Sequence, residues 1–173
     1  MNESRKGTLA TGIVLVIIGA AFIVLNLIPG LTGNKTWPFI FIVGGIGFML
    51  PALIWENARG GLAGLYIPGM ILLVLGGIFL FNTLSGNWAV WAYAWILIPA
   101  SVGLGLYTGA LIGKWHDDVR KTGIWMTIIS AAAFAFFAAL FGNMMVKAIG
   151  AGILILFGLI LVLRTLLHKQ PAK

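Results

Sequence analysis

The sequence predicts an all-α polytopic membrane protein with six transmembrane helices, arranged as three tandem helical hairpin repeats. Three observations lead to this fold class. Of the 173 residues, 61% are hydrophobic and only 9% are charged, whereas soluble domains carry about 25% charged residues. The apolar runs are long enough to cross a bilayer, which takes about 20 residues, and glycines recur from run to run. We expect one integral membrane domain over residues 1–173, with hairpins at about 8–58, 62–114 and 120–168.

The first hairpin is expected to contain helices from about Leu9 to Ile28 and from about Trp37 to Trp55. Pro29-Gly30 ends the first helix, because this pair breaks helices. Pro38 is tolerated near the start of the second, because its missing N–H would be unpaired there in any case. The first run is too long for the apolar core of a signal peptide, so we expect a retained helix.

The second hairpin follows a short polar connector, Glu56 to Gly61, with helices from about Leu62 to Phe81 and Trp88 to Ile112. Pro99 lies inside the second of these helices. A proline there removes the hydrogen bond to the carbonyl of Trp95, so we expect a kink.

The third hairpin has helices from about Gly123 to Phe141 and from Val146 to Leu167, after a charged connector, Lys114 to Thr122. No segment between or beyond the six runs is long enough for a soluble domain. We therefore expect no enzymatic or sensory domain outside the membrane.

Repeated glycines support the hairpin repeat. The matching residues are Gly12, Gly19 and Phe22 with Gly69, Gly76 and Phe79, then Trp37, Gly45 and Gly47 with Trp95, Gly103 and Gly105, and in a weaker third copy Gly123 with Gly69. Asn26, Asn82 and Asn143 also recur near the ends of the odd-numbered helices. The repeated unit is an intact hairpin, so the copies are parallel and not the inverted repeats typical of alternating-access transporters.

The formal net charge of +7 is interpreted as a topology signal. One side of the six-helix arrangement carries Arg5, Lys6, Arg59, Lys114, Arg120, Lys121, Arg164, Lys169 and Lys173, and the other only Lys35 and Lys147. The positive-inside rule then predicts a multi-pass membrane protein with both termini in the cytoplasm. The expected partners of the basic residues are lipid headgroups and not nucleic acid.

Two stripes of small residues are the candidate packing or partner faces. They are Ser101, Gly105, Gly109 and Gly113 in the fourth predicted helix, and Gly123, Thr127, Ala131, Ala135 and Ala139 in the fifth. Small residues at this spacing let helix backbones approach closely in lipid. The stripes could serve packing within one chain, or contact with another membrane subunit or a second copy.

The candidate aromatic interface consists of Trp37, Trp88, Trp91 and Trp95. The last three fall on one face of a continuous helix. Such rings form belts at the headgroup level. The alternative is a docking face for a lipid, a quinone, a pigment or another subunit.

No catalytic, cofactor-binding or metal-ligating set is predicted, and no cofactor is expected. The chain has no cysteine, which excludes thiolate metal sites. Neither His116 nor His168 lies within a predicted span, and no ionisable residue lies mid-span, where proton relays and ion-coupling sites are found. An enzyme is therefore not expected.

The run from Gly12 to Gly47, GIVLVIIGAAFIVLNLIPGLTGNKTWPFIFIVGGIG, resembles the LiaI-LiaF-like transmembrane region of bacterial envelope proteins. The shared features are glycines seven apart, an Asn before the turn, Trp-Pro, and an apolar run into a Gly pair. The resemblance implies a role in envelope-stress regulation. The three-hairpin plan is also similar to that of the HdeD-type acid-resistance membrane proteins.

Together these features predict a non-enzymatic inner-membrane protein that acts through helix–helix and lipid contacts. It would be an envelope-stress accessory or regulator, or a small structural subunit of a larger complex. The alternative is a channel or carrier for a neutral or lipidic solute.

Overall fold

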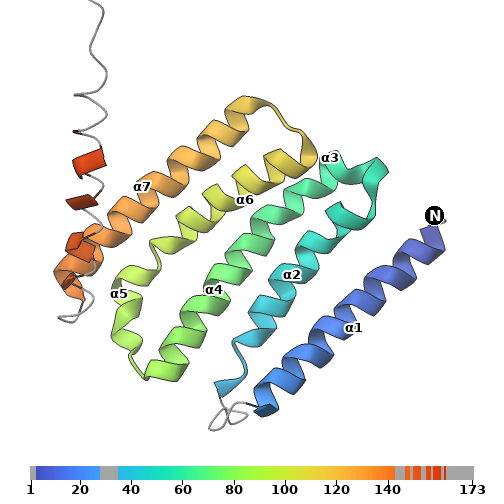
Figure 1. Cartoon of the computed structure of the whole chain (residues 1–173), viewed down its shortest axis with the longest axis horizontal. Helices are drawn as coiled ribbons and strands as arrows, with labels where there is room; N and C mark the ends of the chain where they lie inside the picture. The colour runs from blue at the N-terminus through green and yellow to red at the C-terminus, as the bar shows by residue number, and fades with distance from the viewer. Residues whose placement is uncertain are drawn as a thin grey trace, which may run out of the picture.

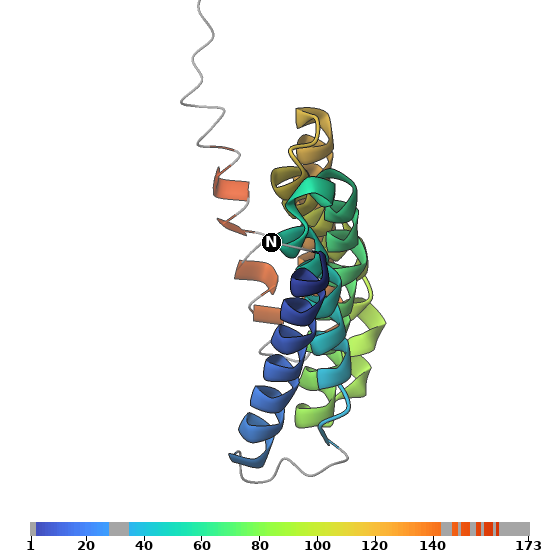
Figure 2. The same cartoon turned by 90° about the vertical axis from the view of Figure 1, so that its right-hand side faces the viewer.

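The computed structural model describes residues 3–27, 35–142, and within the last predicted span residues 147–148, 150–152, 155–156, 158–160 and 162. The regular elements in these ranges are all helical. The long helices α1, α2, α4, α6 and α7 lie side by side in chain order (Figure 1). Seen from the edge, they form one thin layer (Figure 2). Each of them packs mainly against the helices that precede and follow it, and α1 against α2 is the sparsest of these contacts.

The first two helices differ slightly from the predicted spans. Helix α1 covers Glu3–Leu27, because polar residues such as Glu, Arg and Lys continue a helix as readily as apolar ones. Helix α2 covers Phe39–Ile54. It begins after Trp37 and Pro38, which form a turn in which the Phe39 amide donates to the Thr36 carbonyl at 3.1 Å.

The short polar connector between the first two predicted hairpins is helical. A 3₁₀ turn at Glu56–Ala58, α3 at Arg59–Leu62 and a second 3₁₀ turn at Ala63–Leu65 lead directly into α4 at Tyr66–Ser85. Arg59 supports this segment, because its Nε donates to the Ala52 carbonyl at 3.1 Å. Gly86, at φ +67°, ends α4 four residues beyond the predicted end, in the left-handed conformation that glycine adopts at helix ends.

The predicted kink in the fourth span is confirmed. This region is divided into a 3₁₀ turn at Trp88–Val90, α5 at Trp91–Ala94 and α6 at Leu97–Gly113, with a bend of 57° at the break. Because Pro99 cannot donate to the Trp95 carbonyl, the Ile98 amide donates to it instead, at 3.0 Å. A 3₁₀ hydrogen bond thus replaces the lost α-helical one.

The charged connector is shorter than predicted, because α7 begins at Asp117 and ends at Phe141. Asp117 and Asp118 occupy its first turn, where acidic side chains interact favourably with the helix dipole. Lys114, at φ +53°, reverses the chain after α6. Half of the sixth predicted helix, about Val146 to Leu167, lies outside the described residues.

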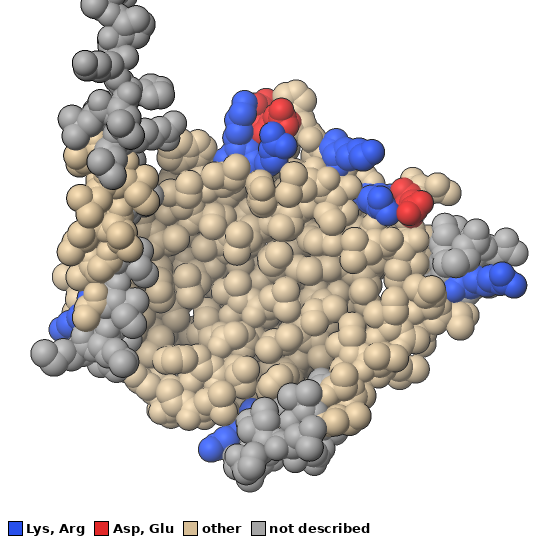
Figure 3. All heavy atoms as spheres, in the orientation of Figure 1, with Lys and Arg blue, Asp and Glu red and all other residues tan. Residues whose placement is uncertain are grey.

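Among the described residues, two segments, Glu56–Ser85 and Asp117–Phe141, are long and apolar enough to cross a membrane, and the bent pair α5 and α6 is a third if it counts as one span. Helix α2, with 16 residues, is about 24 Å long and shorter than a hydrocarbon core of about 30 Å. The structure is therefore that of an all-helical protein compatible with a membrane location. In the view of Figure 3, charged side chains lie along the edges of the layer, where helices begin and end, and the broad face between them is uncharged.

Candidate functional site

Two reciprocal glycine contacts hold the centre of the layer together. A Cβ atom on Gly45 of α2 would lie 2.7 Å from the carbonyl oxygen of Gly69 in α4, and one on Gly69 would lie 2.9 Å from that of Gly45. Gly103 of α6 and Gly123 of α7 repeat the arrangement, with 2.7 Å in both directions. Glycine is required at all four positions, because any Cβ would overlap backbone atoms of the neighbouring helix.

The stripe on α6 packs within the chain. Cβ atoms on Gly105 and Gly109 would lie 2.6 Å from the Ile67 Cα and 2.8 Å from the Ala63 carbonyl oxygen, respectively. Ser101 is fully buried and donates to the Ile98 carbonyl at 2.6 Å. Gly113 lies under the Trp115 ring, whose Nε1 donates to the Gly60 carbonyl at 2.7 Å. The three glycines pack on the start of α4, on the turn before it and on Trp115.

The small-residue stripe on α7 contacts two different neighbours, α6 near its start and Gly150 near its end. Gly123 meets Gly103 on α6, and Thr127 Oγ1 lies 3.4 Å from the Ala100 carbonyl and 2.8 Å from its own Gly123 carbonyl. Further along, Ala135 and Ala139 face Gly150, where a Cβ would lie 2.8 Å from the Ala135 carbonyl oxygen and 3.0 Å from the Ala139 amide nitrogen. Between these two contacts, Ala131 is exposed.

The predicted aromatic face is not continuous, because the helix breaks within it. Trp37 and Trp91 both pack against Phe79, with ring centroids 4.9 Å and 5.4 Å from that of Phe79. Trp88 and Trp95 remain 51% and 52% exposed. Only these two of the four predicted tryptophans therefore present most of their ring to the surroundings.

The charged turn between α6 and α7 carries short-range ion pairs on the surface. Arg120 lies 3.1 Å from Asp117, and His116 Nδ1 lies 3.1 Å from Asp118. These side chains are largely exposed, so such pairs contribute little to stability. Among the residues that the structure describes, no three metal-ligating side chains gather in one place.

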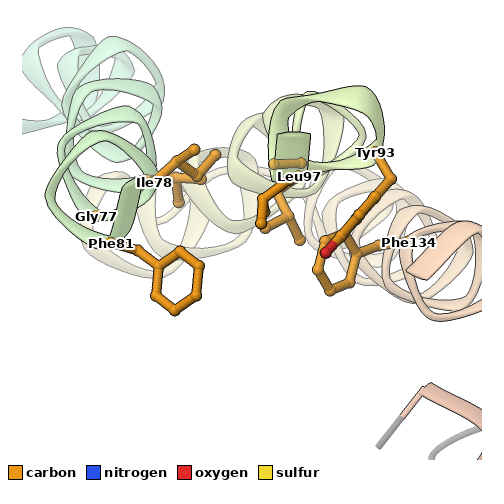
Figure 4. A pocket seen from close by; sticks show the side chains of 9 residues that line it. Gly77, Ile78, Phe81, Tyr93, Leu97 and Phe134 are labelled. Atoms are coloured by element: carbon orange, nitrogen blue, oxygen red, sulfur yellow. The ribbon is translucent and has the colours of Figure 1, made fainter. Parts of the chain in front are cut away.

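The structure also shows a cavity that the sequence did not predict. It encloses about 390 Å³ at the break between α5 and α6 (Figure 4). Its walls come from α4, the Trp88–Val90 turn, α5, α6 and α7, and consist of Val74, Gly77, Ile78, Phe81, Val90, Tyr93, Ala94, Leu97 and Phe134. Pro99 was the one feature of the sequence that pointed to this region, because it predicted the kink. The cavity itself could not be predicted, because the opening beside a kink depends on how the neighbouring helices pack.

Asn82, on the last turns of α4, is completely buried. Neither its side-chain oxygen nor its nitrogen has a hydrogen-bond partner among the described residues, and the same holds for the hydroxyl of Thr83. The sequence marked Asn82 as one member of a recurring Asn pattern. Of the other members, Asn143 lies outside the described residues and the side chain of Asn26 is not described.

Comparisons with family models, curated proteins and solved structures found no match to this chain.

Proposed function

We propose that this protein is a non-enzymatic, six-span protein of the bacterial inner membrane that acts through contacts with other helices and with lipids. In this proposal both termini lie in the cytoplasm, and the protein is an envelope-stress accessory or regulator, or a small subunit of a larger membrane complex. The resemblance of residues 12–47 to the LiaI-LiaF-like transmembrane region supports the envelope role.

The observation that carries the proposal is the single layer of helices. Such a layer buries mainly the sides where neighbouring helices touch, and the described chain leaves most of its broad faces uncovered. Large apolar side chains are accordingly exposed on every long helix, for example Val16 (70%), Ile40 (74%), Phe81 (52%), Leu111 (48%) and Phe141 (64%). Such faces suit lipid or another membrane subunit.

The proposed partner surface is the exposed tryptophan pair, Trp88 and Trp95. The small-residue stripes are largely occupied by contacts within the chain, so they offer little surface to a partner. Tryptophan is enriched among the few residues that contribute most of the binding energy of a protein–protein interface. Trp88 begins the 3₁₀ turn that follows the turn at the end of α4, and Trp95 directly follows α5, at the bend.

Site-specific crosslinking tests the partner surface. Because the sequence has no native cysteine, an introduced cysteine is the only thiol that can react. Ala92 lies between the two tryptophans and is exposed, and Ala131 is an exposed control on α7. We expect Ala92→Cys, but not Ala131→Cys, to form a discrete adduct with a second copy or an identified membrane protein when a bifunctional maleimide is added to native membranes. Trp88→Ala with Trp95→Ala should abolish this adduct, whereas Trp125→Ala, at a residue 63% exposed elsewhere, should not.

A protein that is monomeric after gentle extraction, with no adduct from either cysteine, would contradict the proposed mode of action. The channel or carrier alternative remains a prediction. Reconstituted liposomes that leak neutral solutes or exchange lipids only when they contain this protein would support it instead.

A further inference from the structure

The cavity at the bend is built from side chains that are buried on its floor and exposed at its mouth. Ile78, Tyr93 and Ala94 are 7%, 3% and 2% exposed, whereas Phe81 is 52% exposed. A volume of about 390 Å³ lies within the range of about 300–1,000 Å³ typical of small-molecule sites. The cavity is therefore large enough for a ligand and open on one side.

Tyr93 is the only lining residue with a polar side chain. Its ring packs against Phe134, with centroids 5.7 Å apart, and Figure 4 shows its oxygen on the same side of the ribbons as the other lining side chains. The hydroxyl has no hydrogen-bond partner among the described residues. The Tyr93 side chain is largely buried, but its hydroxyl oxygen reaches the otherwise apolar cavity, so this group is suited to a ligand that supplies an acceptor.

The position of the cavity along the layer restricts the ligand further. On α4 its lining runs from Val74 to Phe81, and α4 ends at Ser85. At 1.5 Å per residue these positions lie about 6–17 Å from the end of the helix. In a bilayer this depth runs from just below the headgroups into the acyl chains.

We propose that this cavity binds one acyl chain of a membrane phospholipid and that the Tyr93 hydroxyl donates a hydrogen bond to its ester carbonyl. The hydrocarbon chain matches a lining without charged side chains, and the carbonyl supplies the acceptor that Tyr93 lacks. This site is separate from the exposed tryptophan pair, so the two proposals can fail independently.

Gly77 provides a way to fill the cavity without disturbing the fold. A Cβ at Gly77 would have no atom within 4 Å, although the residue lines the cavity. Gly77→Leu should therefore place its side chain in the space of the acyl chain. Gly47→Leu is the matched control, because a Cβ at Gly47 on α2 also has no atom within 4 Å and lies outside the cavity.

The experiment uses proteoliposomes that contain phosphatidylethanolamine with a photoreactive diazirine on one acyl chain. After irradiation, adducts are mapped by mass spectrometry. We expect the wild-type chain to concentrate adducts on Phe81, Val90 and Leu97, Gly77→Leu to lose them, and Gly47→Leu to retain them. Tyr93→Phe, which removes only the hydroxyl, should lower occupancy about fivefold at subsaturating lipid, the effect of one hydrogen bond.

Two results would overturn the proposal. One is an unchanged adduct pattern in Gly77→Leu, or labelling spread evenly over all exposed helix faces. The other is crosslinking of a cysteine at Leu97 to residues 147–162, which would show that the chain's own last segment fills the cavity. Circular dichroism of each variant confirms that it is folded, so that a lost adduct reports on the site.

Discussion

Asn82 shows what a single buried polar side chain means in this fold. It is fully buried on α4, and neither polar atom of its amide has a partner among the described residues. Leaving a buried donor or acceptor unpaired costs about 1–3 kcal/mol. The recurring Asn pattern in the sequence identified the residue, but only the packing of the helices showed that its amide is enclosed.

Replacing Asn82 with leucine, which has a similar shape and no polar atoms, should raise stability. We expect the free energy of unfolding of Asn82→Leu to increase by about 1–3 kcal/mol, because the unpaired amide is removed. Reversible denaturation by sodium dodecyl sulfate in bicelles measures this change. Asn57→Leu, at an exposed position, is the control and should leave stability nearly unchanged. A loss of stability in Asn82→Leu would show that the amide is hydrogen-bonded in the membrane.

At the scale of the helices, equivalent glycines of the predicted repeats make equivalent contacts. Gly45 and Gly103 were matched by sequence, and each meets a glycine in the first helix of the next predicted hairpin, Gly69 or Gly123. These two reciprocal glycine contacts thus join one predicted hairpin to the next. In contrast, Gly12, matched to Gly69, has open space beside it. Residues matched by the sequence repeat therefore make equivalent helix contacts at only some positions.

A methyl group at one of these crossings should force two helices apart. We expect Gly123→Ala to lower the free energy of unfolding by about 1–3 kcal/mol, since its Cβ would lie 2.7 Å from the Gly103 carbonyl oxygen. Gly47→Ala, which has open space, should change stability by less than about 1 kcal/mol and in the stabilising direction. The same bicelle denaturation measures both. Equal effects of the two substitutions would contradict the close crossing of α6 and α7.

At the scale of the whole molecule, the layer has two different ends. One end carries Lys114 after α6, together with the ion pairs of Arg59 before α4 and of Arg120 and Lys121 in the first turns of α7. The turn after α4 at the opposite end of that helix is polar and uncharged, with Ser85, Gly86 and Asn87. This asymmetry supports the proposed orientation, because basic residues are retained on the cytoplasmic side.

Single cysteines test this orientation directly. We expect Ser85→Cys to react with a membrane-impermeant maleimide added to intact spheroplasts. His116→Cys, in the charged turn, should react only after permeabilisation. Both native residues are exposed, so a difference in labelling reports the side of the membrane and not burial. Reaction of both cysteines from the same side would exclude a bilayer-spanning arrangement of the bent helix between them.

The sequence by itself determined the helical fold class, the bend before Pro99 and the absence of cysteine chemistry. Each depends on local composition or on one missing backbone donor. Only the tertiary structure decided that the helices lie in one layer, that Ala131 faces outward while Gly123 and Ala135 face different neighbours, and that a cavity opens beside the bend. The physical reason is that nearly all sides of these helices are apolar, so hydropathy does not indicate which side meets protein and which meets lipid.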